Sequence, residues 1–189
     1  MTDMTARFIG YAIVSEDGML ADASGAIPPA MIVPADQDFF MQGLDRAEAI
    51  VHGRHSAEQP TAAYRRRLIV TRGIPALALA PAPAPPKSWL WNPAGCTIAQ
   101  ALSALGVTGG EVAIIGGTDV FGLFLPLYDV FYLSRVPAVV LPGGRPVFPQ
   151  VPAQSPEDTL AGHGMSPGPA RVLDTGRAVT VVAWKRTLR

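Results

Sequence analysis

The sequence has very few of the residues that form disulfides and metal sites. Its 189 residues include one cysteine, Cys96, and three histidines. A single cysteine cannot close an internal disulfide, and His52, His55 and His163 lack the spacing of metal ligands. We therefore expect no metal, and we interpret Cys96 as a small packed or loop residue.

An excess of charge of either sign is also absent. Lys and Arg together number 15, as do Asp and Glu, so the formal net charge is zero. Neutralising a phosphate backbone requires a broad basic surface, which this composition does not provide. We expect no binding to DNA or RNA.

Long uninterrupted hydrophobic runs are missing too. No run approaches the roughly 18 to 20 residues of a membrane span. The most apolar tract, residues 74–86, is broken repeatedly by proline. The N-terminus has no basic segment before a long apolar stretch, so a signal peptide is not indicated. We expect a cytoplasmic protein with no membrane partner.

What is present is enough apolar material for one core. The hydrophobic fraction is 49%, and we expect a single domain over residues 1–189. Short β-branched runs predict strands, helical spacing of apolar residues predicts helices, and Gly/Pro-rich stretches predict loops. The strands are expected at residues 8–14, 49–51, 68–70, 111–115, 130–136 and 178–184, the helices at 34–46, 97–105 and 119–125, and the loops at 18–33, 74–95 and 141–149.

Two further elements complete the expected fold. Ser56 is positioned to cap a short helix, and residues 170–174 should pair with the last strand through a turn at 174–176. Strands alternate with helices over the first two thirds of the chain and then occur alone. This order predicts an α/β fold, with a mainly parallel central sheet flanked by helices and an antiparallel C-terminal hairpin.

Polar residues and glycines follow several of these strands, where open α/β sheets bind ligands. Residues 52–56 (HGRHS) combine a guanidinium, an imidazole and a hydroxyl suited to a pyrophosphate. Thr71 and Arg72 suit an additional phosphate, such as the 2′-phosphate of NADPH. Residues 115–119 (IGGTD) allow close backbone approach. Each segment alone is more typical of ordinary turns and helix caps than of a ligand site.

Taken together, the segments resemble the dihydrofolate reductase superfamily. Residues 33–36 (VPAD), followed by Phe39 and Phe40, look like its Leu-Pro-x-Asp…Phe helix. Residues 52–56 look like its Met-Gly-Arg-x-Thr turn, and residues 115–117 look like its Ile-Gly-Gly signature. The segments at 124–126 and 132–134 continue the match in the same order.

The resemblance implies a small-molecule substrate and NADPH as cofactor. Asp36 would contact a pterin and assist its protonation, with Ser134 nearby, although a solvated first-turn Asp is the alternative. Arg65 could pair with a substrate carboxylate or be a plain surface cation. The residues implied to line the substrate pocket are Ile9, Met31, Phe40, Arg65 and Phe121.

For NADPH, the resemblance implies phosphate contacts from Arg54, His55, Ser56, Thr71 and Arg72. It also implies a cis peptide between Gly116 and Gly117 beside the nicotinamide, and a lid at residues 18–33 that excludes water. The remaining cofactor contacts implied are Gly53, Ile115, Thr118 and Val120.

Other segments leave the substrate open. Residues 15–21 and 141–148 look more like the reductase domain of riboflavin biosynthesis, which reduces a ribosylamino-pyrimidine. We therefore expect a reductase of dihydrofolate or a related pterin, with the pyrimidine reductase as the alternative. A non-catalytic NADPH-binding protein on the same fold also stays possible. A monomer and a homodimer are equally compatible with the sequence.

Overall fold

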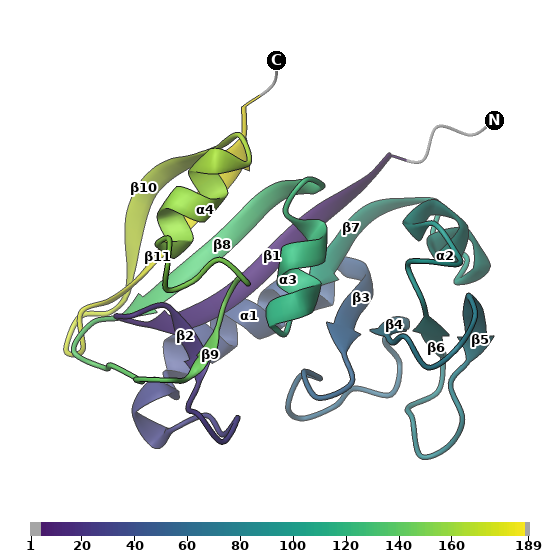
Figure 1. Cartoon of the computed structure of the whole chain (residues 1–189), viewed down its shortest axis with the longest axis horizontal. Helices are drawn as coiled ribbons and strands as arrows, with labels where there is room; N and C mark the ends of the chain where they lie inside the picture. Colours follow the sequence, from purple (N-terminus) through teal and green to yellow (C-terminus); the bar gives the residue numbers. More distant parts are fainter. Residues whose placement is uncertain (1–4, 188–189) are drawn as a thin grey trace.

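A nine-stranded sheet dominates the computed structural model, which describes residues 5–187 (Figure 1). Its strands run in the order β10-β11-β8-β1-β7-β3-β4-β6-β5, and β2 and β9 form a separate pair. The strands are β1 (Thr5–Ser15), β2 (Met19–Ala21), β3 (Ala47–Gly53), β4 (Arg67–Val70), β5 (Leu77–Leu79), β6 (Ser88–Trp91), β7 (Gly109–Ile114), β8 (Tyr128–Val136), β9 (Arg145–Pro146), β10 (Met165–Asp174) and β11 (Val179–Arg186).

The sheet is parallel from β8 through β1, β7, β3 and β4 to β6. β11 pairs with β8 and with β10 in the antiparallel direction, and β5 pairs antiparallel with β6 at the other edge. The expected α/β fold with an antiparallel C-terminal hairpin is confirmed.

Helices cover both faces of the sheet. The helices are η1 (Pro29–Met31), α1 (Pro34–Arg46), α2 (Ile98–Ala104), α3 (Thr118–Phe124) and α4 (Pro156–Gly162). In Figure 1, α3 and α4 lie in front of the sheet and α1 lies behind it. Alternation along β8 supplies both layers, because Phe131 and Leu133 join the large core on the α3 side while Val130 and Tyr132 join the smaller cluster on the α1 side.

The helix starts follow local sequence. Pro34 occupies the first turn of α1, where its missing N–H costs nothing. Thr97 and Gln100 form a capping box at the start of α2, within the range 97–105 predicted to be helical. Ser155 caps α4, a helix that our reading of the sequence missed.

The prediction of a loop at residues 74–95 was wrong in part, because the segment contributes β5 and β6 to the main sheet. Trp91 at the end of β6 is buried against Phe124, with ring centroids 6.1 Å apart. Its indole N–H donates to the Cys96 carbonyl at 2.8 Å. Tertiary packing of this tryptophan overrides the loop-like Pro/Ala composition around it.

The short helix expected after Ser56 does not form, and residues 54–66 are an irregular loop. Within this loop Glu58 turns inward to pair with Arg67 on β4, which ties the segment down without helical hydrogen bonds. The loops at 18–33 and 141–149 are also more ordered than expected. They contain β2 and β9, which pair antiparallel.

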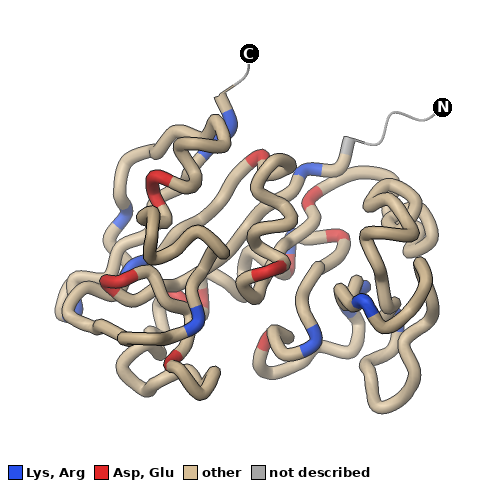
Figure 2. The backbone as a smooth tube through the Cα atoms, in the orientation of Figure 1, with Lys and Arg blue, Asp and Glu red and all other residues tan. Residues whose placement is uncertain are grey.

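Charge is spread thinly over the surface. Figure 2 shows Lys and Arg interspersed with Asp and Glu along the described chain. Among residues 5–187 no helix has the length and apolar character needed to cross a membrane. The same residues contain no group of His, Cys, Asp and Glu arranged to hold a metal ion.

Candidate active site

Asp36 lies in the first turn of α1, and its side chain faces the sheet instead of solvent. The residue is 9% exposed, and its backbone N–H donates to the Val33 carbonyl at 3.0 Å. Burial raises the pKa of the Asp36 carboxyl above its ordinary value, and a hydrogen-bonding interaction with the Ser134 hydroxyl lowers it by less. The structure therefore places Asp36 and Ser134 together, and the solvated alternative for Asp36 is wrong.

Residues near the C-terminus of the chain contact the segment that precedes Asp36. Met31 and Val33 are buried in a small cluster with Val136 of β8 and Val179 of β11. The Arg177 guanidinium, in the turn between β10 and β11, donates to the Ile32 carbonyl at 2.8 Å and also to the Ala30 carbonyl. We conclude that the C-terminal hairpin fixes the backbone that positions Asp36.

Phe40, one helical turn after Asp36 in α1, belongs to a cluster of apolar and aromatic side chains between α1 and the sheet. Ile9, Ile115 and the partly buried Phe40 belong to one cluster, which also contains Tyr11. The Tyr11 ring stacks on Tyr132 with centroids 5.2 Å apart, and burial raises the pKa of Tyr11 to about 12. Because burial of a charge in such an apolar environment costs more free energy than burial of a neutral group, an uncharged heterocycle fits beside this cluster better than an ion.

Phe121 occupies a different position from Ile9 and Phe40. It is buried in the large core on the α3 side, where its ring packs against Phe131 and Phe148. Its ring also lies where a side chain on Gly116 would project, since a Cβ there would be 2.6 Å from the ring. Phe121 therefore packs against Gly116 from the core on the α3 side, whereas Phe40 belongs to the cluster on the α1 side.

The carboxyl ends of β3 and β7 meet at the two adjacent glycines. The peptide between Gly116 and Gly117 is cis, as the resemblance implied. The Gly53 N–H donates to the Gly116 carbonyl at 2.7 Å, and Val120 and Ser56 lie next to these glycines. The structure thus brings Gly53, Ser56, Gly116, Gly117 and Val120 together.

The expected phosphate contacts lie at the ends of neighbouring strands. Arg54 and His55 follow β3, Thr71 and Arg72 follow β4, and the two strands pair directly. Arg54, His55 and Arg72 are exposed, whereas the Thr71 hydroxyl accepts from the Gly73 N–H at 3.0 Å. Three charged or ionisable side chains are therefore free to meet an anionic ligand from solvent.

Thr118 is engaged elsewhere. Its hydroxyl donates to the Pro146 carbonyl at 2.5 Å, which ties the start of α3 to β9. Because β9 pairs with β2, the segment expected to form a lid is connected through Pro146 to the residue next to Gly117.

Arg65 does not occupy the exposed position expected of a surface cation. Its side chain is 5% exposed, and it pairs with Asp45 at 2.8 Å and lies 3.6 Å from Glu58. The guanidinium has carboxylate partners within the chain, while its Nε and Nη1 have no hydrogen-bond partner among residues 5–187. A contact between Arg65 and a substrate carboxylate stays a prediction.

Sequence reasoning missed a buried ion pair next to Arg65. Arg67 is fully buried at the start of β4, and its two terminal nitrogens donate to the Glu58 carboxylate at 2.6 and 2.5 Å. Arg67 also donates to the Ala62 carbonyl at 2.7 Å. An arginine leading directly into the apolar strand was the available signal, because a buried cation needs a partner.

No protein-family model and no curated protein matches this sequence, whereas many solved structures match its fold. A protein assigned to riboflavin biosynthesis from Shewanella sp. PV-4 is 19% identical over 96% of this chain and 99% of its own, with a TM-score of 0.65. Dihydrofolate reductase from Enterococcus faecalis, solved in complex with NADP(H) and RAB-propyl, is 16% identical over 96% of both chains, with a TM-score of 0.62.

A third match is a pyrimidine reductase-like protein from Corynebacterium diphtheriae. It is 14% identical over 97% of this chain and 92% of its own, with a TM-score of 0.65. These likenesses define the class of the fold, which is dihydrofolate-reductase-like. Within that class, dihydrofolate reductase and the pyrimidine reductases match this chain about equally well.

Proposed function

We propose that this chain is an NADPH-dependent reductase that adds a hydride and a proton across a C=N bond of a heterocycle, with 7,8-dihydrofolate or a related pterin as substrate. The observation that carries the proposal is the buried Asp36 carboxyl. It has a raised pKa, and it lies beside Ser134 and an apolar wall that contains Phe40. A carboxyl in this setting keeps its proton to higher pH than one in water.

The residues around Asp36 then have distinct roles. The Asp36 carboxyl would hydrogen-bond an amino-pyrimidine edge and hold the proton that the ring nitrogen accepts. Ile9, Phe40 and Ile115 would pack on the heterocycle and exclude water, and Met31 supports the segment that leads to Asp36. Ser134 would orient the carboxyl and limit how far its pKa rises.

The glycine pair and the strand ends fit a dinucleotide. A side chain at Gly116 would meet the Phe121 ring, and its φ of +95° lies in the region that favours glycine, so this position has to be glycine. Gly53, Ser56 and Val120 lie around it, and Arg54, His55 and Arg72 would meet the phosphates, with Arg72 on the 2′-phosphate. When bound, NADPH supplies the hydride.

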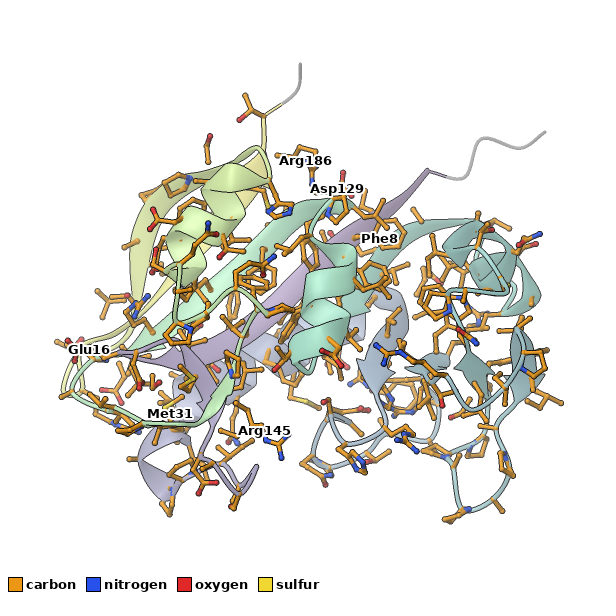
Figure 3. All side chains as sticks on the ribbon, in the orientation of Figure 1. Phe8, Glu16, Met31, Asp129, Arg145 and Arg186 are labelled. Atoms are coloured by element: carbon orange, nitrogen blue, oxygen red, sulfur yellow. The ribbon has the colours of Figure 1, made fainter. Side chains whose placement is uncertain are left out.

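A second candidate is the reduction of a ribosylamino-pyrimidine, as in riboflavin biosynthesis. It is favoured by Arg65, because its Nη2 already pairs with the Asp45 carboxylate and only Nε and Nη1 lack a hydrogen-bond partner among the described residues. Arg145 on β9 is exposed, and its guanidinium lies 3.7 Å from where a side chain on Gly25 would begin (Figure 3). A cation beside the proposed lid suits a phosphorylated substrate.

The test is oxidation of NADPH by the purified chain, followed by absorbance, with dihydrofolate in one arm and the ribosylamino-pyrimidine phosphate in the other. Turnover of dihydrofolate supports the first proposal, and turnover of the pyrimidine alone supports the second. Binding of NADPH without turnover of either substrate would mean that the chain is a non-catalytic binding protein. A cytoplasmic location and a monomeric or homodimeric state remain predictions from the sequence.

A further inference from the structure

A hollow lies between α4 and the C-terminal hairpin, on the α3 side of the sheet. α4 packs against β10 here and lies in front of the sheet in Figure 1. The volume of the hollow is about 190 Å³. We call it the α4 cavity, and the lining residues that matter here are Leu133, Arg135, Glu157, Ala170, Val182 and Trp184.

The α4 cavity and Asp36 lie on opposite faces of the sheet, because successive side chains of a strand point to opposite faces. On β8, Leu133 lines the cavity, whereas its neighbour Ser134 interacts with Asp36. On β11, Trp184 lines the cavity, whereas its neighbour Ala183 packs on the cluster on the α1 side. The strand ends of β3 and β4 lie further along the sheet, beyond β1 and β7. A ligand in the α4 cavity would therefore be separate from the candidate active site.

A buried hydrogen-bond donor of the α4 cavity has no partner. Trp184 is 6% exposed, and its indole N–H has no hydrogen-bond partner among residues 5–187. The buried Trp91, by contrast, donates its indole N–H to the Cys96 carbonyl at 2.8 Å. An indole nitrogen can only donate. Because an unpaired buried donor costs free energy, a ligand that places an acceptor against Trp184 gains affinity.

The two charged residues that line the α4 cavity neutralise each other. The Arg135 guanidinium donates to the Glu157 carboxylate of α4, and it also donates to the Glu16 carbonyl at 2.6 Å. The lining therefore carries no net charge. A charged ligand would lose its hydration without gaining an unpaired counter-charge, so this cavity favours a neutral ligand.

We propose that the α4 cavity binds a neutral aromatic ring that carries a carboxamide. An apolar cavity of about 150 Å³ holds one benzene molecule, so this volume accommodates a six-membered ring with one small substituent. Leu133, Val182 and the Trp184 ring offer apolar contact to such a ring. The carboxamide oxygen would accept from the Trp184 N–H, and its amino group lies within the chemistry that Glu157 accepts. The proposal does not depend on the proposed function, because its test measures binding alone.

Ligands of one shape and different charge test the chemistry. Benzamide is neutral and has a carbonyl acceptor, benzamidinium is a cation without an acceptor, and benzoate is an anion. We expect benzamide to bind the full chain with a millimolar Kd, as is usual for so small a ligand, and both ions to bind at least about tenfold more weakly. An ion that binds as tightly as benzamide would overturn the proposal. So would the absence of benzamide binding at millimolar concentration, which would leave ordered water as the partner of Trp184.

The indole N–H of Trp184 reports directly on the site. The chain has three tryptophans, so an NMR spectrum of isotope-labelled protein contains three indole N–H signals. The signal that is missing in Trp184→Phe belongs to Trp184. Benzamide should shift this signal and leave those of Trp89 and Trp91 in place. A shift confined to Trp89 or Trp91 would contradict the proposed site.

Variants separate the lost donor from a general loss of structure. Trp184→Phe keeps an aromatic ring without the N–H and should weaken benzamide about tenfold, whereas the control Trp89→Phe should bind like wild type.

A second variant fills the cavity from its edge. Ala170 is exposed on β10, so Ala170→Phe tests the cavity even if Trp184→Phe does not fold. We expect Ala170→Phe to weaken benzamide at least about tenfold. Val172→Phe is the matched control, because Val172 is exposed on the same strand and does not line the cavity. Equal affinities in wild type, Ala170→Phe and Val172→Phe would overturn the proposal.

Discussion

Asp36 and Glu58 are both buried carboxylates, yet their surroundings shift their pKa values in opposite directions. Around Asp36 there is an apolar wall and a hydroxyl, and burial raises the pKa of the carboxyl. Burial also acts to raise the pKa of Glu58, but hydrogen bonds from Arg67 and the Ala62 N–H, with the charge of Arg67, bring it below its ordinary value. The same functional group is prepared for proton transfer in one place and for structural pairing in the other.

The arginines of this region fall into a buried pair and an exposed pair. Arg65 and Arg67 are buried with Glu58 and hold the loop at residues 54–66 against β4. Arg54 and Arg72, one strand end away, are exposed and have room for a ligand. Internal pairing thus engages Arg65 and Arg67 with carboxylates of the chain, whereas Arg54 and Arg72 face solvent.

The largest effect is expected on stability from Glu58→Gln. The substitution leaves the buried Arg67 without a counter-charge, and breaking such a pair costs about 3 to 5 kcal/mol in the free energy of unfolding. The matched control is Glu48→Gln, which removes an exposed partner of Arg66 and should cost no more than about 1 kcal/mol. Urea unfolding measures both, and similar small losses would mean that Glu58 does not anchor the loop.

The next effect is expected on catalysis from Asp36→Asn. Loss of the proton donor should raise the activation free energy that corresponds to kcat/KM by about 2 to 5 kcal/mol. The affinity for NADPH should be nearly unchanged. Asp38→Asn changes an exposed carboxylate on the same helix and should have little effect. Steady-state kinetics on the substrate identified above provide the measurement, and an unchanged kcat/KM would remove Asp36 from the mechanism.

A smaller effect is expected on cofactor choice from Arg72→Ala. Loss of a charge-assisted contact to the 2′-phosphate should weaken NADPH by about 1.5 to 3 kcal/mol and leave NADH nearly unchanged. Fluorescence titration with the two dinucleotides makes the comparison. Equal losses for both would place the 2′-phosphate elsewhere.

The pH dependence of stability should differ in sign between the two carboxylates. The pKa of Asp36 is raised in the folded state, so its contribution is present below its unfolded pKa and is lost as pH rises through the folded value. The contribution of Glu58 is present above its unfolded pKa and is lost as pH falls through the folded value. The free energy of unfolding of Asp36→Asn and of Glu58→Gln, measured between pH 3 and about pH 7, should therefore differ from that of wild type with opposite dependence on pH. The same pH dependence in both variants would contradict the comparison.

The smallest effect is expected from Ser134→Ala. The Ser134 hydroxyl lowers the pKa of Asp36, so its loss should raise that pKa further. Activity that requires protonated Asp36 falls as pH rises through this pKa, and the falling limb of the rate profile should move to higher pH. A limb that does not move would show that Ser134 has no influence on the carboxyl.

Much of the fold could be predicted because its central strands carry their own signal. Residues 8–14 and 111–115 are largely apolar runs followed by polar or glycine residues, and residues 130–136 are rich in β-branched and aromatic residues. These segments form β1, β7 and β8. β6 gave no such signal, because Trp91 becomes strand through contacts with Phe124, 33 positions further along the sequence numbering.

The site was predicted unevenly for a similar reason. Asp36 and the glycine pair lie within short local motifs, so residue spacing was enough to single them out. The surroundings of Arg65 and Arg67 depend on Glu58, which leaves the expected helical path to reach them. A buried ion pair between a loop and a strand has no local pattern, and only the folded arrangement reveals it.

The hydrogen bonds from Arg177 to the segment before Asp36 also have a consequence for folding during synthesis. The helix that carries Asp36 is synthesised early, but the carbonyl of Ile32 in front of it is held by a side chain 145 residues later. A growing chain that ends before Arg177 therefore lacks the contact that fixes the approach to Asp36. Because contacts of such long range form slowly, we expect the segment before Asp36 to be among the last parts of the protein to reach its native form during folding.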